Sequence, residues 1–550
     1  MGTGDDGARE MTAKRALDFD LGQALSDPGF TPRVRDVRAL LDHVASGDEH
    51  AEAAERALLR VGAPAGLVAA ERAPEAPPIE RYRLTKLVGR LAAESGGEAL
   101  APFLFARLED ADDRTRRAAA NALGKARPQG SSEALAAALA RAAEGPTRKA
   151  LIEALGKAGG EAAVAALSLE IEGIPGSVEA KARLMAERTV AREVASTIDG
   201  TRTIEGPIPV VLRCRQGLER ILLAELDADL GAHVARRPLG GARIEAELSG
   251  PLERIFQART MLSFAFPLPE IRITRGADLA PVIAEALTSK AALDLFHRFT
   301  TGPVRYRLGW ASGGKRRAVV WRAASEVAEL ARKAGIDLVN DPTDSLWDVT
   351  VFEAVGSIRI ELSPRLADPR FTYRKGDVPA ASHPTIAAAL IRAGGVKASD
   401  IVWDPFMGSG LELCERALAG PYQLLIGTDR DVSAIAIARE NLAAAGARDP
   451  ILMTGDATSI ALPGRPSLIV TNPPLGRRVE RTAELSPMLD RLMARAARSL
   501  VKGGRMVWIA PFPDKSDLVA LRGGLEITMA EDVDMGGFTG RLQVLRRPEG

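Results

Sequence analysis

Apolar residues recur at helical spacing between about residues 30 and 200, in a segment rich in Ala, Leu and Arg. Three similar phrases occur there: KLVGRLAAESGGEALAPFL, NALGKARPQGSSEALAAAL and EALGKAGGEAAVAAL. Their shared glycines, Gly89, Gly124 and Gly156, are spaced 35 and 32 residues apart. Each unit predicts a helix that ends at the glycine, a short turn and a second helix. This period is typical of stacked helical repeats, and an Ala-rich bundle without a binding role is the alternative.

The pattern changes after about residue 200, where β-branched and aromatic residues become frequent. Residues 207–270 predict a small α+β unit, with a strand, a turn at Gly217, a helix, a second strand in GARIEAEL and a second helix in PLERIFQARTM. Residues 271–376 predict a further domain of alternating helices and strands. From 377 to 550, strands and helices alternate in the order of a doubly wound parallel sheet, followed by two strands that could form an edge hairpin.

Composition limits the function classes only slightly. The formal net charge is +1 with 26% charged residues, so overall charge neither favours nor excludes a polyanionic partner. The two cysteines, Cys214 and Cys414, offer no metal-ligand spacing and favour a reducing compartment, for which we expect the cytoplasm. The N-terminus lacks an apolar core of signal-peptide length, and no run of about 18 apolar residues occurs. We therefore expect neither a membrane segment nor a metal site.

A local concentration of basic residues, interleaved with aromatic ones, lies between residues 305 and 375. Its aromatic members are Tyr306, Trp310, Trp321, Phe371 and Tyr373. Such a mixture suits phosphate contact combined with base stacking, whereas a solvated surface is the alternative. The residues that we expect to contact RNA are Arg305, Arg307, Lys315, Arg316, Arg317, Arg370, Arg374 and Lys375.

Three strand ends in the last segment carry polar or glycine residues typical of a nucleotide site. The stretch DPFMGSG, residues 404–410, follows a predicted strand and opens a predicted helix, where Gly408 and Gly410 permit close backbone approach. Asp429 ends the next strand and can accept hydrogen bonds from ribose hydroxyls, and Asp456 follows the third. The combination favours an adenosyl cofactor over an α/β core with unused turns.

The fourth strand ends in LIVTNPPLGRR, where two prolines must close the strand. An exocyclic base amine is a poor nucleophile because its lone pair is delocalised into the ring. The Asn472 side-chain oxygen and the Pro473 carbonyl can accept its two N–H bonds and aim the lone pair at the methyl group of S-adenosylmethionine. The alternative is that NPP is a plain turn.

These motifs resemble known families. From DPFMGSG to TNPPLGRR the chain is similar to class I amino-methyltransferases, and NPP followed by Leu-Gly-Arg is similar to the RNA guanine-N2 branch, which usually reads NPPYG. CRQGLERILLAEL resembles the ferredoxin-like unit that precedes a THUMP domain. SPRLADPRFTYRKG with SHPTIAAALIRAGG resembles the junction between THUMP and catalytic domains in those enzymes. The repeats of residues 30–200 resemble HEAT repeats, which lie outside that family plan.

The resemblance implies S-adenosylmethionine as cofactor and a target amine held at the fourth strand. Met407, Leu411 and Leu475 depart from the usual pattern, and Leu475 replaces the aromatic that stacks on the base. The implied catalytic residues are Asn472, Pro473, Pro474 and Leu475. The implied cofactor-binding residues are Asp404, Phe406, Gly408, Gly410, Asp429, Asp456 and Asn472.

The sequence thus predicts an S-adenosylmethionine-dependent methyltransferase acting on guanine N2 in tRNA or rRNA, with a possible protein partner at the repeats. Two alternatives remain open. The same motif could methylate adenine N6 or a protein Gln side chain. The chain could instead be an RNA- or ribosome-binding adaptor with an inactive methyltransferase fold.

Overall fold

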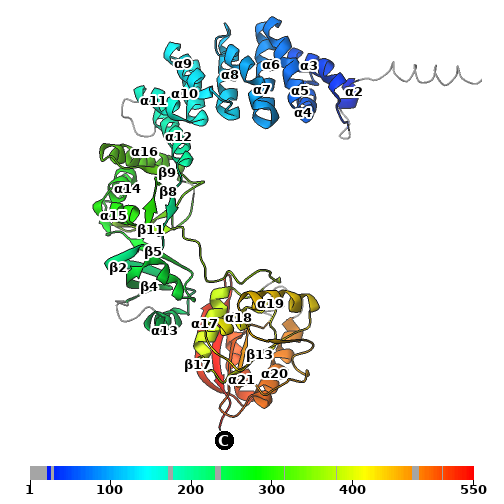
Figure 1. Ribbon diagram of the computed structural model, residues 1–550, viewed down its shortest axis with the longest axis vertical. Helices are drawn as coiled ribbons and strands as arrows, with labels where there is room; N and C mark the ends of the chain where they lie inside the picture. Colours follow the sequence, from blue (N-terminus) through cyan, green and yellow to red (C-terminus); the bar gives the residue numbers. More distant parts are fainter. Residues whose placement is uncertain are drawn as a thin grey trace, which may run out of the picture. The chain divides into compact units, whose positions relative to one another are not determined.

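The computed structural model of the protein describes residues 21–25, 30–170, 177–229, 237–314, 316–379, 381–473, 482–510 and 512–549. The chain forms two compact units, whose helices and strands are coloured along the sequence in Figure 1. The first contains residues up to 197 together with 272–358, and the second contains residues 198–271 together with 359–550. Within the described ranges, no helix has the length and apolar character needed to cross a membrane.

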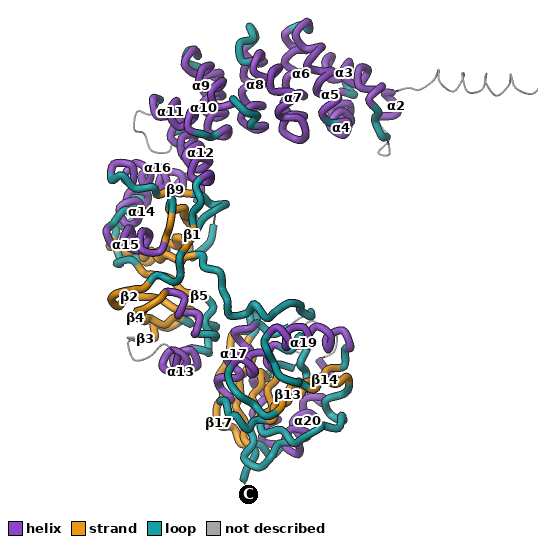
Figure 2. Tube along the Cα trace, viewed as in Figure 1, coloured by secondary structure: helices purple, strands orange, loops and turns teal. Residues whose placement is uncertain are grey.

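The first unit begins with the predicted helical repeats (Figure 2). Their apolar faces share one core that includes Leu40, Leu58, Leu87, Leu123 and Leu155, all buried. The helices are α2 (Leu21–Leu25), α3 (Val37–Ser46), α4 (Ala51–Val61), α5 (Ala63–Arg72), α6 (Pro78–Leu91), α7 (Gly97–Arg107), α8 (Asp113–Ala126), α9 (Ser131–Arg141), α10 (Pro146–Ala158), α11 (Glu161–Leu169) and α12 (Val178–Glu193).

The repeated glycines have a different role from the predicted one. Gly89, Gly124 and Gly156 lie inside the last turns of α6, α8 and α10 and do not end those helices. Each faces an alanine of the next repeat helix so closely that a Cβ on Gly124 would lie 2.8 Å from the Cα of Ala154. The glycines therefore set the close packing of α6 on α8, α8 on α10 and α10 on α12.

An α/β layer completes the first unit. Strands β10, β8 and β9 are parallel in this order, and α14 packs on α16 beside them. The buried Trp347 of β10 meets Phe296 edge to face at 5.1 Å and donates to Thr300 at 2.9 Å. The elements are α14 (Leu279–Leu287), α15 (Lys290–Phe299), β8 (Val304–Trp310), α16 (Arg317–Lys333), β9 (Leu338–Asn340) and β10 (Trp347–Ala354).

The second unit opens with a small antiparallel sheet in the order β3-β4-β2-β5-β11. Its elements are β2 (Thr203–Arg213), α13 (Glu219–Asp229), β3 (Arg237–Gly240), β4 (Arg243–Pro251), β5 (Ser263–Pro267) and β11 (Ser357–Pro364). The helix predicted in PLERIFQARTM is present as a short 3₁₀ helix, Leu252–Gln257. The amides of Arg259 and Thr260 donate to the Glu225 carboxylate at 2.7 and 2.9 Å, so the helix does not continue.

The C-terminal part has the predicted doubly wound sheet, in the order β14-β13-β12-β15-β16-β18-β17. All pairs from β14 to β16 are parallel, and β17 and β18 form the predicted antiparallel edge pair. Helices α17, α18 and α19 pack on one another, as do α20 and α21.

The strands of this sheet are β12 (Ile401–Asp404), β13 (Leu424–Asp429), β14 (Ile451–Thr454), β15 (Leu468–Thr471), β16 (Arg505–Ala510), β17 (Glu526–Asp534) and β18 (Thr539–Arg546). Its helices are α17 (Pro384–Gly394), α18 (Leu411–Leu418), α19 (Val432–Ala444), α20 (Thr482–Ser499) and α21 (Pro513–Arg522). The fold class predicted from the sequence is confirmed: helical repeats, mixed sheet regions and a doubly wound α/β domain.

The glycine contacts generate a stability prediction. Replacing Gly by Ala inside a helix ordinarily stabilises it by about 1 kcal/mol. We expect Gly124→Ala to destabilise the repeats by about 1 to 3 kcal/mol, because the new methyl overlaps the Ala154 backbone. The control is Gly97→Ala in α7, whose Cβ would meet nothing closer than 3.5 Å. Calorimetry that places Gly124→Ala at or above the wild-type melting temperature would contradict the packing role.

Candidate functional site

Four polar side chains lie where successive strands of the parallel sheet end. Asp404 and Asp429 are the last residues of β12 and β13, Asp456 follows β14, and Asn472 follows β15. Since β14, β13, β12 and β15 are adjacent and parallel, their carboxyl ends share one edge. Ligands of open α/β sheets bind at this edge. The structure therefore brings the predicted cofactor and catalytic positions to one place.

The Gly-rich turn after β12 is fixed by hydrogen bonds to these acids. The Phe406 amide donates to the Asp404 carboxylate at 3.1 Å, and the Gly408 amide donates to Asp429 at 2.9 Å. Gly408 and Gly410 have φ values of +48° and +79°, which favour glycine. A Cβ on Gly410 would lie 3.1 Å from Ala438 of α19, so the turn also fits closely against that helix.

Two of these carboxylates, Asp404 and Asp456, have opposite electrostatic surroundings. Asp404 is fully buried, and its Oδ2 has no hydrogen-bond partner among the described residues. Burial, reinforced by the charge of Glu412, raises the pKa of Asp404 well above its usual range. By contrast, the Thr458 hydroxyl and amide, together with the Arg430 guanidinium, lower the pKa of Asp456 to about 2. One Asp404 carboxyl oxygen is therefore buried without a hydrogen-bond partner within the described ranges, whereas both oxygens of Asp456 have protein partners.

The Asn472 side chain is held by one hydrogen bond and leaves one acceptor without a partner. Its Nδ2 donates to the Ser382 hydroxyl oxygen at 2.9 Å, and the Ser382 hydroxyl donates to the Glu412 carboxylate. The Oδ1 of Asn472 is buried and has no partner in the described part of the chain. Pro473 follows it and is buried. Pro474 and Leu475, also predicted as catalytic, lie outside the described residues.

Ser382 and Glu412 are site residues that the sequence reasoning missed. Glu412 lies two residues after Gly410 in α18 and is 3% exposed. Burial raises its pKa from 4.5 to about 7. An acid directly after the Gly-rich turn, in an otherwise apolar helix start, was the available signal.

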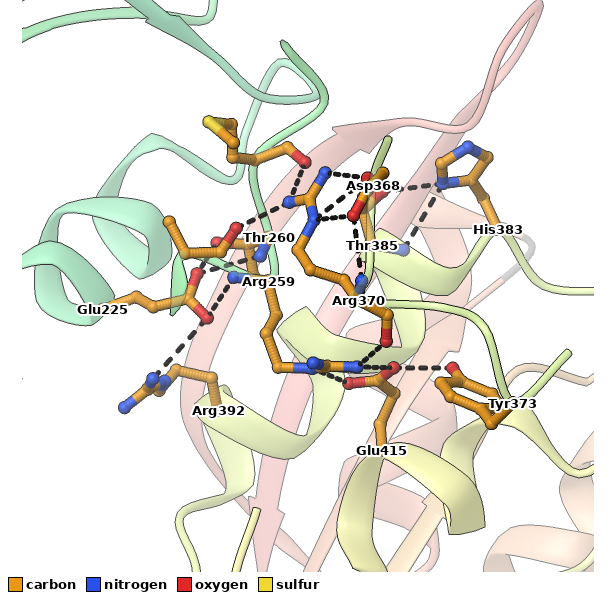
Figure 3. A network of polar contacts seen from close by, with 12 residues as sticks. Glu225, Arg259, Thr260, Asp368, Arg370, Tyr373, His383, Thr385, Arg392 and Glu415 are labelled. Atoms are coloured by element: carbon orange, nitrogen blue, oxygen red, sulfur yellow. Dashed lines mark hydrogen bonds and ion pairs between the residues drawn. The ribbon is translucent and has the colours of Figure 1, made fainter. Parts of the chain in front are cut away.

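A second buried network fixes α18 to the small antiparallel region of the same unit (Figure 3). The Arg259 guanidinium binds both oxygens of Glu415 at 2.6 and 2.9 Å, and the Tyr373 hydroxyl donates to Glu415 at 2.6 Å. Arg259 also donates to the Arg370 carbonyl at 2.6 Å. Because both guanidinium bonds to Glu415 are charge-assisted, the network anchors the helix that begins at the Gly-rich turn.

Two predicted RNA-contact residues are structural, which corrects the sequence prediction. Arg370 is 6% exposed and donates to the carbonyls of Ala258 and Met261 at 2.6 and 2.7 Å. Arg305 is 5% exposed and donates to the carbonyls of Ala191 and Asp344 at 2.9 and 3.0 Å. Their guanidinium groups join chain segments, so they are not available to phosphate.

The other predicted cations that the structure describes, Arg307, Arg316, Arg317, Arg374 and Lys375, are exposed or half-buried. Arg307 pairs with Asp348 at 3.1 Å, Arg316 pairs with Glu353, and Arg374 pairs with Asp377. Arg317 and Lys375 are exposed, and Lys315 lies outside the described residues. The aromatics Tyr306, Trp310 and Tyr373 are buried, so they serve the core and do not offer stacking faces. No group of three or more potential metal ligands occurs among the residues that the structure describes.

Comparisons with known families match two parts of the chain. Residues 372–537 match the RMKL-like methyltransferase domain family, and residues 76–169 match HEAT repeats. A solved structure of TrmN from Thermus thermophilus superposes on 62% of this chain and 99% of its own, with 22% identity and a TM-score of 0.49.

Two curated relatives share a shorter segment. A tRNA (guanine(10)-N2)-dimethyltransferase from Methanothermobacter thermautotrophicus is 34% identical over 134 residues, which is 24% of this chain and 39% of the relative. The U6 snRNA (guanine-N(2))-methyltransferase THUMPD2 from Bos taurus is 32% identical over 125 residues, which is 22% of this chain and 24% of the relative. The chain thus spans well under two thirds of either relative.

The family matches agree with the two regions in which the sequence predicted stacked repeats and a class I methyltransferase fold. Residues 372–537 thus form an RMKL-like methyltransferase domain, and residues 76–169 form HEAT repeats.

Proposed function

We propose that this protein is an S-adenosylmethionine-dependent RNA methyltransferase that modifies the exocyclic N2 amine of a guanine in tRNA or rRNA. The observation that carries the proposal is the buried Oδ1 of Asn472, directly after β15, which has no hydrogen-bond partner among the described residues. Buried acceptors are almost always hydrogen-bonded, so an acceptor without a partner at this edge of the sheet favours a ligand that supplies a donor. Both curated relatives are named as guanine-N2 methyltransferases of RNA.

The residues present fit the cofactor. The free Oδ2 of Asp404 can accept from the amino group of its methionine part, and a cation there would favour the ionised carboxyl. Gly408 and Gly410 permit close backbone approach. We assign the ribose to Asp429 and the adenine to the neighbourhood of Asp456, with Phe406 in the turn between. When bound, S-adenosylmethionine supplies a methyl group on a positively charged sulfur.

Asn472 and Pro473 would hold the target amine. The Asn472 Oδ1 and the Pro473 carbonyl accept the two N–H bonds, which turns the nitrogen lone pair toward the methyl group. No general base is required, because the alkylated amine is acidic and loses its proton to water. We assign Pro474 to keeping the turn rigid and Leu475 to apolar contact with the base.

Ser382 and Glu412 would act as positioning residues for this acceptor. The Ser382 hydroxyl has one proton, which it donates to the Glu412 carboxylate. Its oxygen must therefore accept from Asn472 Nδ2, and this fixes the amide with Oδ1 turned away from Ser382. The orientation depends on an ionised Glu412, which links the acceptor to the protonation state of a buried acid.

The assignment of RNA as the substrate class also rests on the domain plan predicted from the sequence. We keep the four predicted regions: HEAT-like repeats at 30–200, a ferredoxin-like unit at 207–270, a THUMP-like domain at 271–376 and the methyltransferase domain at 377–550. Arg307, Arg316, Arg317, Arg374 and Lys375 remain the candidate cations of the middle region. Both cysteines are buried and free, and we retain the cytoplasm as the location.

Asn472→Ala tests the amine site. We expect S-adenosylmethionine affinity to stay within about twofold, because the methionine part, ribose and adenine are assigned to the other three strands and Asn472, although also implied as a cofactor residue, is assigned here to the target amine. Single-turnover methyl transfer to RNA should fall by about 10²- to 10³-fold, as for loss of one preorganised polar group. Asn472→Asp keeps an acceptor and should recover part of the rate. If Asn472→Ala transfers methyl groups at the wild-type rate, NPP is only a turn and Asn472 does not hold the target amine.

Asp429→Ala tests the cofactor site. We expect titration calorimetry to give at least a tenfold weaker affinity, because charge-assisted hydrogen bonds of about 1.5 to 3 kcal/mol are lost. Asp431→Ala removes a nearby carboxylate that caps α19 and should leave the affinity unchanged. Asp429→Asn keeps an acceptor for the Gly408 amide and separates cofactor contact from loop distortion. Equal affinity in all variants would exclude Asp429 as a cofactor residue.

Glu412→Gln tests the buried acid. The pKa of Glu412 is about 7 in the folded protein against 4.5 otherwise, so its ionisation costs folding free energy that increases between pH 4.5 and 7. The variant avoids this cost, and its stability relative to wild type should rise by about 2 to 3 kcal/mol from pH 5 to pH 8. Glu526→Gln, at an exposed position of β17, is the control for the Glu-to-Gln substitution itself. A flat curve for Glu412→Gln would show that Glu412 titrates normally.

A further inference from the structure

The HEAT repeats contain a groove that is lined mainly by positively charged side chains. It lies along α6, α8 and α10, which pack side by side in the repeat stack (Figure 1). Among its lining residues the one carboxylate is Glu94, within the part of the chain that the structure describes. Tyr82 lies in the same groove. The cations that line it are Lys86, Arg90, Arg114, Arg117, Lys125 and Lys157.

Three of these cations follow the repeat period. Arg90, Lys125 and Lys157 each stand directly after one of the glycines Gly89, Gly124 and Gly156. Because each glycine marks the close contact with the next helix, the following basic residue occupies an equivalent position on α6, α8 and α10. The groove therefore carries one cation per repeat in register, and the other three cations add to this row.

The cations of the groove are largely unneutralised by the protein. Of the six, Arg90 forms an ion pair, with Glu55, and no ion pair joins the other five to any residue in the described ranges. A neighbouring groove of the same stack differs in this respect. It is lined by Glu109, Asp113 and Glu144, and its cations Arg116 and Arg141 pair with Asp113 and Glu109. The excess positive charge is thus a property of one groove and not of the whole Arg-rich repeat region.

We propose that this groove, defined by Lys86, Arg90, Arg114, Arg117, Lys125 and Lys157, binds the phosphate backbone of the RNA substrate. Helices that pack in contact lie about 8 to 10 Å apart, so three of them span about 16 to 20 Å. A nucleic-acid strand presents several phosphates over that length. The groove contributes affinity and holds the substrate without reading its sequence. The choice of RNA over an acidic protein segment rests on the proposed function of the methyltransferase domain.

The test is the salt dependence of RNA binding by the full chain. The triple variant Lys86→Glu, Lys125→Glu, Lys157→Glu changes one residue on each of the three helices. Bulk tRNA is the probe, and binding is followed by filter retention between 50 and 200 mM salt. We expect at least about tenfold weaker binding at 50 mM salt, and a log-log salt slope smaller by roughly 2 to 3, because three phosphate contacts are lost.

A matched control separates groove contacts from net charge. Arg38→Glu, Arg60→Glu, Lys149→Glu removes three exposed cations of the repeats that lie outside the groove, with the same change in total charge. The control should keep at least half of the wild-type affinity. Lys86→Gln, Lys125→Gln, Lys157→Gln is the milder variant if charge reversal impairs folding, and circular dichroism checks the helices of each protein.

The outcomes are decisive in each case. Selective loss of affinity and slope in the groove variants supports the proposal. Equal loss in the control overturns it, as does unchanged RNA binding, the result expected if the groove serves an acidic protein partner. Binding is measured without S-adenosylmethionine, so absence of methyl transfer by a wild-type chain that still binds tRNA through the groove would overturn the proposed enzyme activity alone.

Discussion

The candidate site depends on one topological constraint, the shared edge at which the parallel strands β14, β13, β12 and β15 end. Parallel strands place all their carboxyl ends on the same side of the sheet. Residues separated by up to 68 positions, from Asp404 to Asn472, are therefore brought to one edge by strand direction alone. Two further contacts hold the site elements at this edge. The Gly-rich turn is tied to Asp429, and α18 is tied to the small antiparallel region through Glu415.

Two buried acids of α18, Glu412 and Glu415, have different partners and different roles. Glu415 is matched by Arg259 and Tyr373, so its charge is compensated and it holds α18 in place. Glu412 has only the Ser382 hydroxyl as a side-chain partner among the described residues, and burial raises its pKa to about 7. A compensated charge stabilises structure, whereas an uncompensated one is found where a site needs a particular electrostatic environment. Helix α18 therefore carries one acid that holds the helix in place, Glu415, and one acid with a raised pKa beside the candidate site, Glu412.

The sequence predicted the strand ends of the candidate site more accurately than it predicted which cations lie at the surface. Strand ends follow from hydrophobic runs and their terminating Asp, Gly and Pro residues, so Asp404, Asp429 and Asn472 could be placed without a structure. Ser382 could not, because its partner Asn472 is 90 residues away. Charge runs were misleading where burial decides, because Arg305 and Arg370 are buried and bind backbone carbonyls. The groove with five cations that have no ion pair among the described residues lies in the repeats. The role of Gly124 also required the packing of α8 on α10, which local propensity does not reveal.

The central claim is that this edge of the sheet transfers a methyl group to guanine N2 in RNA. The most direct measurement is nucleoside mass spectrometry of RNA from cells with and without the protein, repeated after incubating the RNA of deficient cells with purified protein and isotopically labelled S-adenosylmethionine. The account predicts that labelled N2-methylguanosine appears in tRNA or rRNA and that the same nucleoside is missing from deficient cells. Label in N6-methyladenosine or in protein Gln, or no label in any nucleoside, would contradict it.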